Sequence, residues 1–414
     1  MIFKPIPRQK SSNTLHDLWR TICLAGTKRF LTGAYIKEFE ARFAGVYGIK
    51  HALATGSCRS AFALILDALD IKSGDEVILP AFNMPAFPKI LQCKGIKPVF
   101  IDINSQTLHM DERLIEPNIT PKTKAIVAVH LFGNACPMDA ILALARKHNL
   151  FVIEDCANAW ETRYQSRYVG TWGDVSCFSL GATKDIPTFG GGMILTNDEE
   201  LYARLTRIYE QEMRCPSWTS AMADLLKNTA MLVMSSGLFY GLLVFPVQFL
   251  CFWAGLDLMD YFIEEKDRPL KAVPRHKYTN FQAAVGIHKF TVSEQIQQRR
   301  LWNARIFNAR FHQIPGVQIP QTAPEGEHTY WNYPILVPRR PVLIKKLLQH
   351  GISTKTLDTY NCNRLKIFRD ALKHCPQAER IADMILILPV YHHLNETEIN
   401  FIAEIFEKEC QRFA

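Results

Sequence analysis

Six short apolar runs alternate with amphipathic stretches through the first half of the chain, and this alternation constrains the fold most. Each run is six to eight residues long and rich in the residue types of buried strands. The stretches 60–70 (SAFALILDALD) and 138–149 (MDAILALARKHN) have the spacing of amphipathic helices. Strands and helices that alternate in this way predict a parallel α/β sheet covered on both faces. The predicted strands are 51–56, 76–82, 98–103, 125–132, 150–156 and 175–180.

The last third of the chain has a different pattern, which predicts a smaller α+β domain. Helices are expected at 299–314, 341–351 and 396–413, with a strand at 331–338. A chain of 414 residues is also too long for one ordinary domain. We therefore predict a large domain at 1–215, an apolar helical insertion at 216–265 and a small C-terminal domain at 266–414.

The net charge and the spacing of the cysteines exclude several classes of function. The 48 basic and 40 acidic residues give a net charge of +8, which favours anionic small molecules or an anionic membrane surface. The cations are spread along the chain and no nucleic-acid motif is recognised, so we expect no nucleic-acid partner. The eleven cysteines form no C-x-x-C pair, which is typical of reduced thiols in a cytosolic protein, without a zinc site. The first twenty residues lack the apolar core of a signal peptide.

Two segments carry residues that could perform chemistry. Glu154 and Asp155 end an apolar strand, and Lys184 follows the strand that ends at Ser179. Ligands of open α/β sheets gather beyond such strand ends. Taken alone, the acid fits a helix cap or a salt bridge, and the lysine fits a surface cation. Together they fit pyridoxal phosphate (PLP) chemistry, in which a lysine bonds the cofactor and a carboxylate keeps its pyridine nitrogen protonated.

The chain resembles the DegT/StrS sugar aminotransferases, which bind PLP and have the fold of aspartate aminotransferase (fold type I). The resemblance covers nearly the whole chain outside the apolar insertion, in the family's order. It implies a large, mostly parallel-sheet domain, a smaller C-terminal α+β domain and a homodimer with shared active sites. The matching segments are 30–52, 74–82, 127–141, IEDCANA (153–159), GDVSCFSLGATK (173–184), TNFQAAVG (279–286), WNYPILVP (331–338) and LPVYHHL (388–394).

Four residues match the family's cofactor-binding positions. The resemblance implies that Lys184 is the Schiff-base lysine and that Asp155 is the partner of the pyridinium nitrogen. Asn158 stands where the family usually has Gln or His near the ring, and Ser179 matches the phosphate-binding serine. A related branch that dehydrates keto-sugars has histidine in place of the lysine. Lys184 therefore favours transamination.

Other positions depart from the family's pattern. Ser57, Cys58 and Arg59 replace Ser-Gly-Thr, although backbone N–H groups at this turn can still hold phosphate. Arg59 fits either a contact with the phosphate or a solvated helix residue. Met84 takes the place of an aromatic that often stacks on the ring, and Arg275 that of an asparagine through which the partner subunit reaches the phosphate. Gly181 and Gly190 replace a frequent histidine and glutamate, which widens the space around the cofactor.

Residues 228–256 contain no charged residue or histidine, a run of 29. This length would suit a transmembrane helix. A single crossing is excluded because Lys184 and the segment 276–286 must lie on the same side. Pro246 is expected to divide the run into arms of roughly 17 and 10 residues, each too short to span a bilayer. A helix–break–helix hairpin within one leaflet or in the interface fits better.

The residues around this run fit a membrane surface. Aromatic residues of 218–262 could lie at headgroup level, and nearby cations could face anionic lipid. Burial of the same helices against a partner subunit is the alternative. The aromatic residues are Trp218, Tyr240, Trp253 and Tyr261, and the cations are Arg207, Arg214, Lys227, Lys266, Arg268 and Lys271.

The sequence thus predicts an aminotransferase that moves an amino group from an amino acid, L-glutamate in most relatives, to a keto-sugar. A cytoplasmic enzyme at the inner face of the membrane, with a nucleotide- or lipid-linked sugar as acceptor, is expected. The glycan or glycolipid of a cell surface would be the end product. Two alternatives remain open: a PLP-dependent lyase or carbon–carbon bond-forming enzyme acting on a hydrophobic substrate, and a non-catalytic scaffold.

Overall fold

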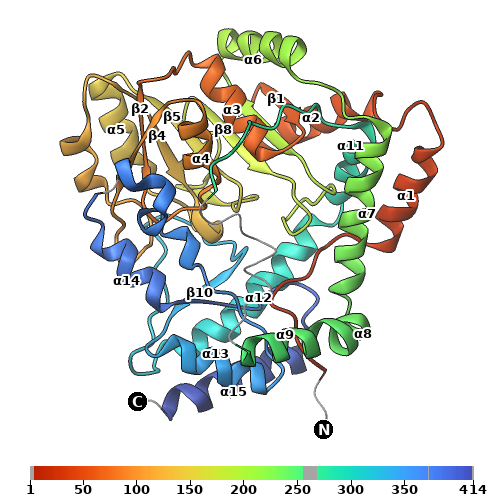
Figure 1. Ribbon diagram of the computed structural model, residues 1–414, viewed down its shortest axis with the longest axis vertical. Coiled ribbons are helices and arrows are strands. Elements are labelled where there is room, and N and C mark those ends of the chain that lie inside the picture. The colour runs from red at the N-terminus through yellow and green to blue at the C-terminus, as the bar shows by residue number, and fades with distance from the viewer. Residues whose placement is uncertain (1–3, 255–267, 372, 413–414) are drawn as a thin grey trace.

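The computed structural model describes residues 4–254, 268–371 and 373–412 (Figure 1). Its centre is a seven-stranded sheet in the order β1-β9-β8-β5-β4-β2-β3. Neighbouring strands run parallel except at β9, which is antiparallel to both β1 and β8. The predicted mostly parallel sheet is confirmed, and all six apolar runs form strands. The strands are β1 (His51–Thr55), β2 (Glu76–Pro80), β3 (Lys97–Ile101), β4 (Thr123–Val129), β5 (Phe151–Asp155), β8 (Val175–Ser179) and β9 (Gly192–Thr196).

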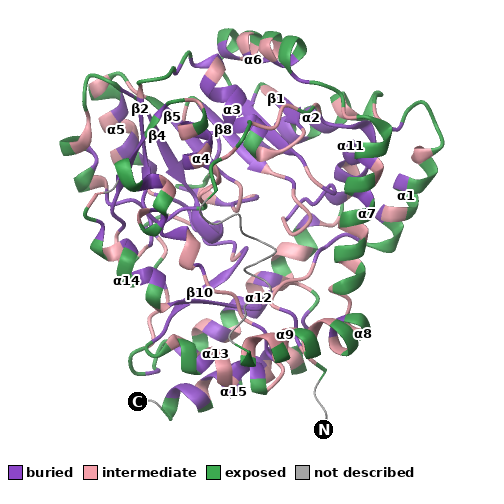
Figure 2. Cartoon of the chain, viewed as in Figure 1, coloured by how far each residue is buried: buried purple, intermediate pink, exposed green. Residues whose placement is uncertain are grey.

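Helices cover both faces of this sheet, and most residues of the central strands are buried (Figure 2). Along β2, Val77 and Leu79 point into one core cluster, whereas Ile78 points into the other. This alternation follows from the two-residue period of a strand. Phe62 of α3 joins the first cluster and Phe43 of α2 joins the second. The helices of this domain are α2 (Tyr35–Tyr47), α3 (Cys58–Ala68), α4 (Ala86–Cys93), α5 (Met138–His148) and α6 (Glu199–Glu212).

The C-terminal third forms a smaller α+β unit, as predicted. Two antiparallel strands, β10 (Tyr333–Leu336) and β11 (Ile385–Leu388), pack with helices around a separate apolar cluster. Its helices are α12 (Ser293–Phe311), α13 (Arg340–Gln349), α14 (Pro376–Met384) and α15 (Glu396–Gln411). Short elements complete the described chain: the hairpin β6 (Arg163–Tyr164) and β7 (Arg167–Tyr168), and 3-10 turns at Glu112–Leu114, Glu116–Asn118, Leu131–Gly133, Asp358–Tyr360, Cys362–Arg364 and Lys366–Ala371.

The division into 1–215, 216–265 and 266–414 stays a prediction, and residues 255–265 lie outside the described chain. Two segments pack across these boundaries. Ile6, near the start of the chain, lies in the cluster of the small domain. Helix α11 (Asn280–Lys289) packs on α2 and on α1 (Leu15–Ala25), and Tyr278 just before it lies in the core of the large sheet.

The apolar insertion is helical. Helix α7 (Trp218–Met234) is followed by α8 (Gly237–Phe239), a π-helical turn at Tyr240–Val244 and α9 (Phe245–Trp253). No single described helix is both long and apolar enough to cross a membrane. Only the pair Trp218–Met234 and Gly237–Trp253, bent by 66°, meets that length and composition together.

The predicted break at Pro246 is wrong. The chain bends at Ser235 and Ser236, and Pro246 lies in the first turn of α9, inside a continuous helical stretch. Proline is tolerated in a first helical turn, and the π-helical turn before it accommodates the missing N–H donor. The predicted exposure of Tyr240 is also wrong, because its side chain is buried. Arg207 lies on α6, at the opposite end of the molecule from α8 and α9 (Figure 1), and Tyr261 and Lys266 fall outside the described residues.

Candidate active site

The carboxyl ends of β5 and β8 bring together the residues that the sequence singled out. Asp155 is the last residue of β5, and Ser179 is the last residue of β8. Because neighbouring strands run parallel here, both residues lie at the same edge of the sheet. Lys184 follows in the turn after β8, and the electrostatic influence of Asp155 reaches its amine.

Asp155 and Glu154 point to opposite faces of the sheet. Glu154 is fully buried and accepts hydrogen bonds from the backbone N–H groups of Gly170, Trp172 and Gly173 at 2.6–2.7 Å. Glu154 therefore holds the loop 170–173 in place, and Asp155 is the carboxylate available to the active site. Asp155 accepts one bond, from the N–H of Ala157 at 3.0 Å. Burial raises the pKa of this carboxyl, and the nearby Lys184 opposes the shift.

Lys184 is held by two polar contacts. Its Nζ donates to Oδ1 of Asn158 at 2.6 Å and lies 3.7 Å from the ring centre of Trp331. The electron-rich face of an indole attracts an ammonium group. Burial nevertheless lowers the pKa of Lys184 to about 8, against the attraction of Cys58 and Asp155. A substantial fraction of this amine is thus neutral near pH 8, which a nucleophilic lysine requires.

Residues far away in the sequence hold the turn that carries Lys184. Gln9 Nε2 donates to the carbonyl of Thr183 at 3.3 Å, and Ser11 Oγ donates to the carbonyl of Ala182. Trp331 Nε1 also donates to the carbonyl of Thr183, at 3.1 Å.

A buried ion pair fixes the next residue along this turn. Asp185 pairs with Arg300 of α12, and Nε of Arg300 donates to the carbonyl of Thr329 at 3.0 Å. The small domain and the start of the chain therefore both set the position of the lysine.

The N-terminus of α3 supplies backbone donors beside this group. Ser57 caps the helix, and its Oγ accepts the N–H of Ser60 at 3.1 Å. The first N–H groups of a helix have no partner within the helix and attract anions. The sulfur atoms of Cys58 and Cys177 and a carboxylate oxygen of Asp155 lie within 4.8 Å of one another. Cys58, at the start of α3, therefore lies close to the carboxylate of Asp155. Arg59 is exposed on the first turn of the helix.

Glycines allow the chain to pass close to this turn. A β-carbon on Gly192 would lie 2.6 Å from the backbone nitrogen of Cys58, and Gly190 and Gly191 have φ angles of 126° and 122°. Glycine is the residue that adopts such angles without strain. The glycines thus let β9 begin directly against the start of α3.

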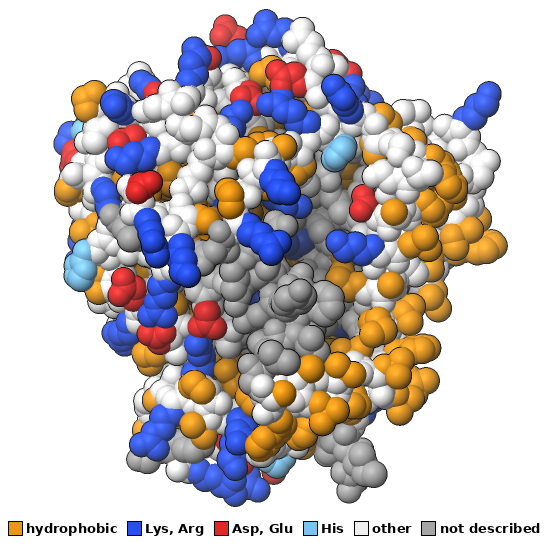
Figure 3. All heavy atoms as spheres, viewed as in Figure 1, with side chains coloured by type: hydrophobic (Ala, Val, Ile, Leu, Met, Phe, Trp, Pro, Cys, Tyr) orange, Lys and Arg blue, Asp and Glu red, His pale blue; other side chains and the backbone are white. Residues whose placement is uncertain are grey.

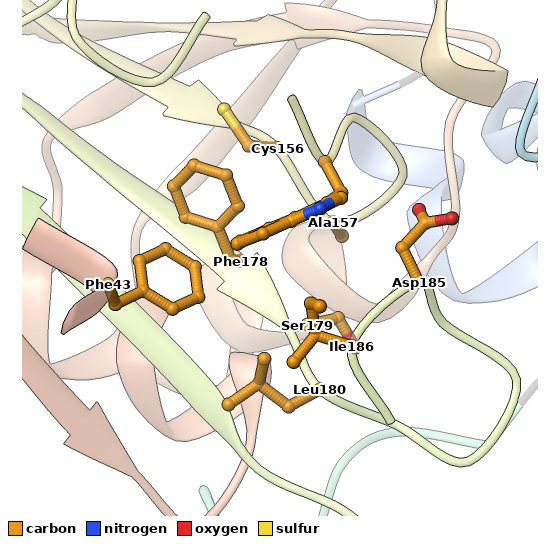
Figure 4. Close-up of a pocket in the computed structure, with 9 residues that line it drawn as sticks. Phe43, Cys156, Ala157, Phe178, Ser179, Leu180, Asp185 and Ile186 are labelled. Carbon is orange, nitrogen blue, oxygen red and sulfur yellow. The ribbon is translucent and has the colours of Figure 1, made fainter. Parts of the chain in front are cut away.

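Ser179 and Lys184 flank Gly181. A β-carbon on Gly181 would lie 3.6 Å from Ser179 Oγ and 3.7 Å from Lys184 Cγ. A cavity of about 10 Å³ lies behind Ser179, between Phe43 and Phe178 on one side and Asp185 on the other (Figure 4). This volume holds about one water molecule. The cavity is a packing gap beside the site and is too small for a cofactor.

Two predicted site residues, Met84 and Arg275, form no described hydrogen bond or ion pair with Asp155, Ser179 or Lys184. Met84 is 52% exposed and follows Asn83, whose buried Nδ2 has no hydrogen-bond partner among the described residues. Arg275 pairs with Glu212 and, at 3.5 Å, with Asp67 of its own chain. The carbonyls of its neighbours Pro274 and His276 accept bonds from Ser60 Oγ and the N–H of Gly56, both at 2.8 Å, so the backbone of Arg275 lies at the start of α3.

Sequence reasoning missed the roles of Trp331 and Arg300. Trp331 belongs to the motif WNYPILVP, whose apolar pattern predicts a strand and does not indicate a role for the indole. Arg300 lies in a helix with many charged residues, where nothing in the pattern distinguishes a buried arginine from a solvated one.

The residues at the sheet edge fit PLP. A partly neutral lysine lies beside a buried carboxylate that accepts one backbone N–H, and helix N–H groups with a serine lie next to them. Nδ2 of Asn83, which has no hydrogen-bond partner among the described residues, adds a donor in the loop after β2. An anionic cofactor with a basic ring nitrogen and a carbonyl matches this set of groups.

Fold and site together define a fold type I PLP-dependent enzyme. The sequence model of the "DegT/DnrJ/EryC1/StrS aminotransferase family" matches residues 20–232 and 267–407. The chain belongs to this family, and it is a PLP-dependent sugar aminotransferase. The match omits residues 233–266, most of the apolar insertion.

Named relatives cover most of the chain. It is 31% identical over 387 residues to the spore coat polysaccharide biosynthesis protein SpsC of Bacillus subtilis, covering 90% of this chain and 88% of the relative. It is 30% identical to the GDP-perosamine synthase of Escherichia coli O157:H7, with 92% of each covered. DesV of S. venezuelae, solved with a ketimine intermediate, has a TM-score of 0.77 at 25% identity over 96% of this chain and 95% of its own.

Proposed function

We propose that this enzyme transfers an amino group from L-glutamate to a keto-sugar, with Lys184 as its catalytic acid and base. One observation carries the assignment of Lys184: its amine lies in a buried site with a pKa lowered to about 8, bonded to Asn158 and within the field of Asp155. PLP, when bound, supplies an electrophilic carbonyl and an electron-accepting ring. The relatives named above for polysaccharide or GDP-sugar synthesis support a sugar acceptor.

Each residue of the site takes one task in this proposal. Asp155 holds a proton on the ring nitrogen, and its burial strengthens that charged hydrogen bond. Lys184 removes and returns the proton at the substrate carbon, for which a pKa near the working pH is best. Asn158 and Trp331 hold the lysine amine between these steps.

The phosphate has its own proposed contacts. Ser179, the Ser57 cap and the N–H groups of Cys58 and Arg59 would hold it at the start of α3. Met84 would pack against the ring, with less geometric definition than an aromatic side chain.

The test uses the purified protein loaded with PLP. Borohydride reduction and peptide mapping should find the cofactor on the peptide of Lys184, and Lys184→Ala should lose this adduct and turnover. L-glutamate should convert the bound cofactor to its amine form, and a keto-sugar should reverse the conversion. If glutamate converts the bound cofactor but no keto-sugar reverses the conversion, the proposal of a keto-sugar acceptor is overturned. Release of a cleaved product would favour a lyase.

We also propose a homodimer with shared active sites, in which Arg275 of one subunit reaches the phosphate bound by the other. Lys184→Ala and Arg275→Ala should each be inactive or weak alone. Mixing and refolding them together should restore about a quarter of the activity, because half of the dimers are mixed and each has one complete site. No recovery would show that each subunit works alone. A lipid-linked acceptor at the inner face of the membrane completes the proposal and draws on the surface described next.

A further inference from the structure

From α8 to α9, the insertion turns a polar group inward and apolar groups outward. Tyr240 is buried, and its hydroxyl bonds Gln248 at 2.8 Å and Ser353 at 2.5 Å. Leu238, Leu242 and Leu250 are 67%, 67% and 68% exposed. A surface helix of a water-soluble protein has the opposite arrangement.

Helix α1 shows the same inversion, although it lies two hundred residues earlier. Its buried side chains are Asp17 and Thr21, both 0% exposed, and Asp17 bonds the buried Lys289 at 2.5 Å. Leu15, Trp19 and Ile22 are 75%, 63% and 50% exposed. They follow the i, i+4, i+7 spacing of one helix face, so this face points to the outside.

The exposed apolar sides of α1 and of the insertion belong to one continuous surface. Trp218, at the start of α7, donates its indole N–H to the carbonyl of Ala25 at the end of α1, at 3.2 Å. Buried Ala221 and Leu225 of α7 pack in a cluster that Leu18 of α1 also contacts. Figure 3 shows hydrophobic side chains gathered over α1, α7, α8 and α9 on one side of the molecule. We call this surface the apolar face.

Cations lie around the apolar face. The amine of Lys4 lies where a β-carbon of Gly237 would point, at the start of α8. The amine of Lys345 lies 3.9 Å from the ring centre of Trp253, at the other end of the insertion. Exposed Arg20 projects from α1, and exposed Lys28 and Arg29 follow it. The uncharged run itself contributes no acidic residue.

We propose that the apolar face is a membrane-binding surface, which inserts shallowly into the interface of an anionic phospholipid bilayer. The bent pair of helices cannot cross the bilayer as one span, but each half can lie along the interface with its apolar side in the acyl region. Trp19, Trp218 and Trp253 lie at headgroup level, and the surrounding cations face lipid phosphates.

A second copy of the chain fits this face less well. Protein interfaces are about as polar as the remaining surface and are enriched in Tyr, Trp, Phe, Met and Arg. The described part of the run of 29 uncharged residues instead exposes mostly Leu and Val, with Met231, Met234, Phe239 and Trp253 beside them. The family's sequence model passes over 233–266, so the part of this surface formed by α8 and α9 is an addition to the shared enzyme.

The test is co-flotation of the full-length, PLP-loaded protein with vesicles of phosphatidylglycerol and phosphatidylethanolamine. We expect strong binding, weaker binding to phosphatidylcholine vesicles, and binding that survives high salt because the contact is largely apolar. The triple variant Leu238→Glu, Leu242→Glu, Leu250→Glu should bind about tenfold less or weaker. Leu15→Glu with Trp19→Glu should reduce binding as well.

Leu114→Glu is the matched control. Leu114 is 40% exposed in a 3-10 turn outside the apolar face, so this variant should float as the parent protein does. Brominated acyl chains should quench tryptophan fluorescence in the parent and less in Trp253→Phe.

Equal flotation of the parent and the triple variant would overturn the proposal. So would a parent that stays off vesicles and forms an oligomer that the same three glutamates dissociate, which would make the face a protein interface. Vesicle binding requires no turnover, so the aminotransferase reaction can fail or succeed independently of this result.

Discussion

Asp155 holds its carboxylate among buried groups, so its charged form is disfavoured before any cofactor binds. The cofactor offers the positive ring nitrogen that compensates this cost. Lys184 is the opposite case, because burial favours its neutral form and only Asn158, Trp331 and nearby negative groups oppose the shift. At the scale of single residues, both catalytic groups are adjusted for their tasks by desolvation.

Asp155→Asn should stabilise the protein without cofactor while abolishing turnover. A carboxyl with a raised pKa in the folded state opposes folding above its unfolded pKa, and this effect disappears as pH falls. The variant should therefore melt at a higher temperature than the parent at pH 7, with a difference that shrinks toward pH 4, near the ordinary Asp pKa. Calorimetry of both apoproteins measures this. A variant less stable at pH 7 would contradict it.

The rate of PLP loading should follow the neutral fraction of Lys184. Below the pKa of about 8, this rate should fall tenfold per pH unit, and above it the rate should level off. Trp331→Leu removes an aromatic face that stabilises the ammonium form, so the midpoint should move to lower pH. Stopped-flow absorbance measures both profiles. An unchanged midpoint in the variant would remove Trp331 from this role.

At the scale of helices and strands, the sequence predicts the features that depend on the local periodicity of apolar residues. The strand ends placed Asp155 and Ser179 at one edge because parallel strands share a direction, and Lys184 followed. The bend at Ser235 was missed because proline is the stronger signal in a sequence, although a first turn tolerates it. The inverted α1 was missed because its exposed apolar stripe resembles an ordinary core stripe. The distant partners His288 and Lys289 show that Asp17 is on the buried side.

Tyr240→Phe should loosen α8 and α9 without affecting the active site. The hydroxyl bonds Gln248 and Ser353 in a buried position, and burial raises its pKa to about 12. Its loss should cost about 1 kcal/mol or more, because Ser353 and Gln248 lose a partner. Hydrogen exchange of 237–253 should become faster while kcat stays unchanged. Tyr35→Phe, at an exposed position in α2, is the control.

At the scale of the molecule, the two domains and the start of the chain meet at one turn. Arg300 of the small domain pairs with Asp185, and Gln9 and Ser11 bond the carbonyls just before Lys184. No sequence pattern predicts these contacts, since the partners lie more than a hundred residues apart. The fold of each domain follows from the local periodicity of apolar residues, whereas the contacts between the domains form only when distant parts of the chain come together.

Arg300→Met should destabilise the protein by about 3–5 kcal/mol, because it leaves Asp185 buried without its cation. Arg300→Met with Asp185→Leu should recover much of that loss. Urea unfolding of the four proteins of this cycle measures the coupling. Arg113→Met, which breaks the pair of an exposed arginine with Asp111, should cost about 1 kcal/mol or less. A double variant no more stable than Arg300→Met would contradict the coupling.

The short link between Ser11 and the start of α1 has a mechanical consequence. Ser11 is tied to the turn that carries Lys184, and Thr14 caps the helix whose outer side belongs to the apolar face. Three peptide links separate these two anchors, and a chain segment so short has no slack. A displacement of α1 is therefore expected to move the turn that carries the catalytic lysine.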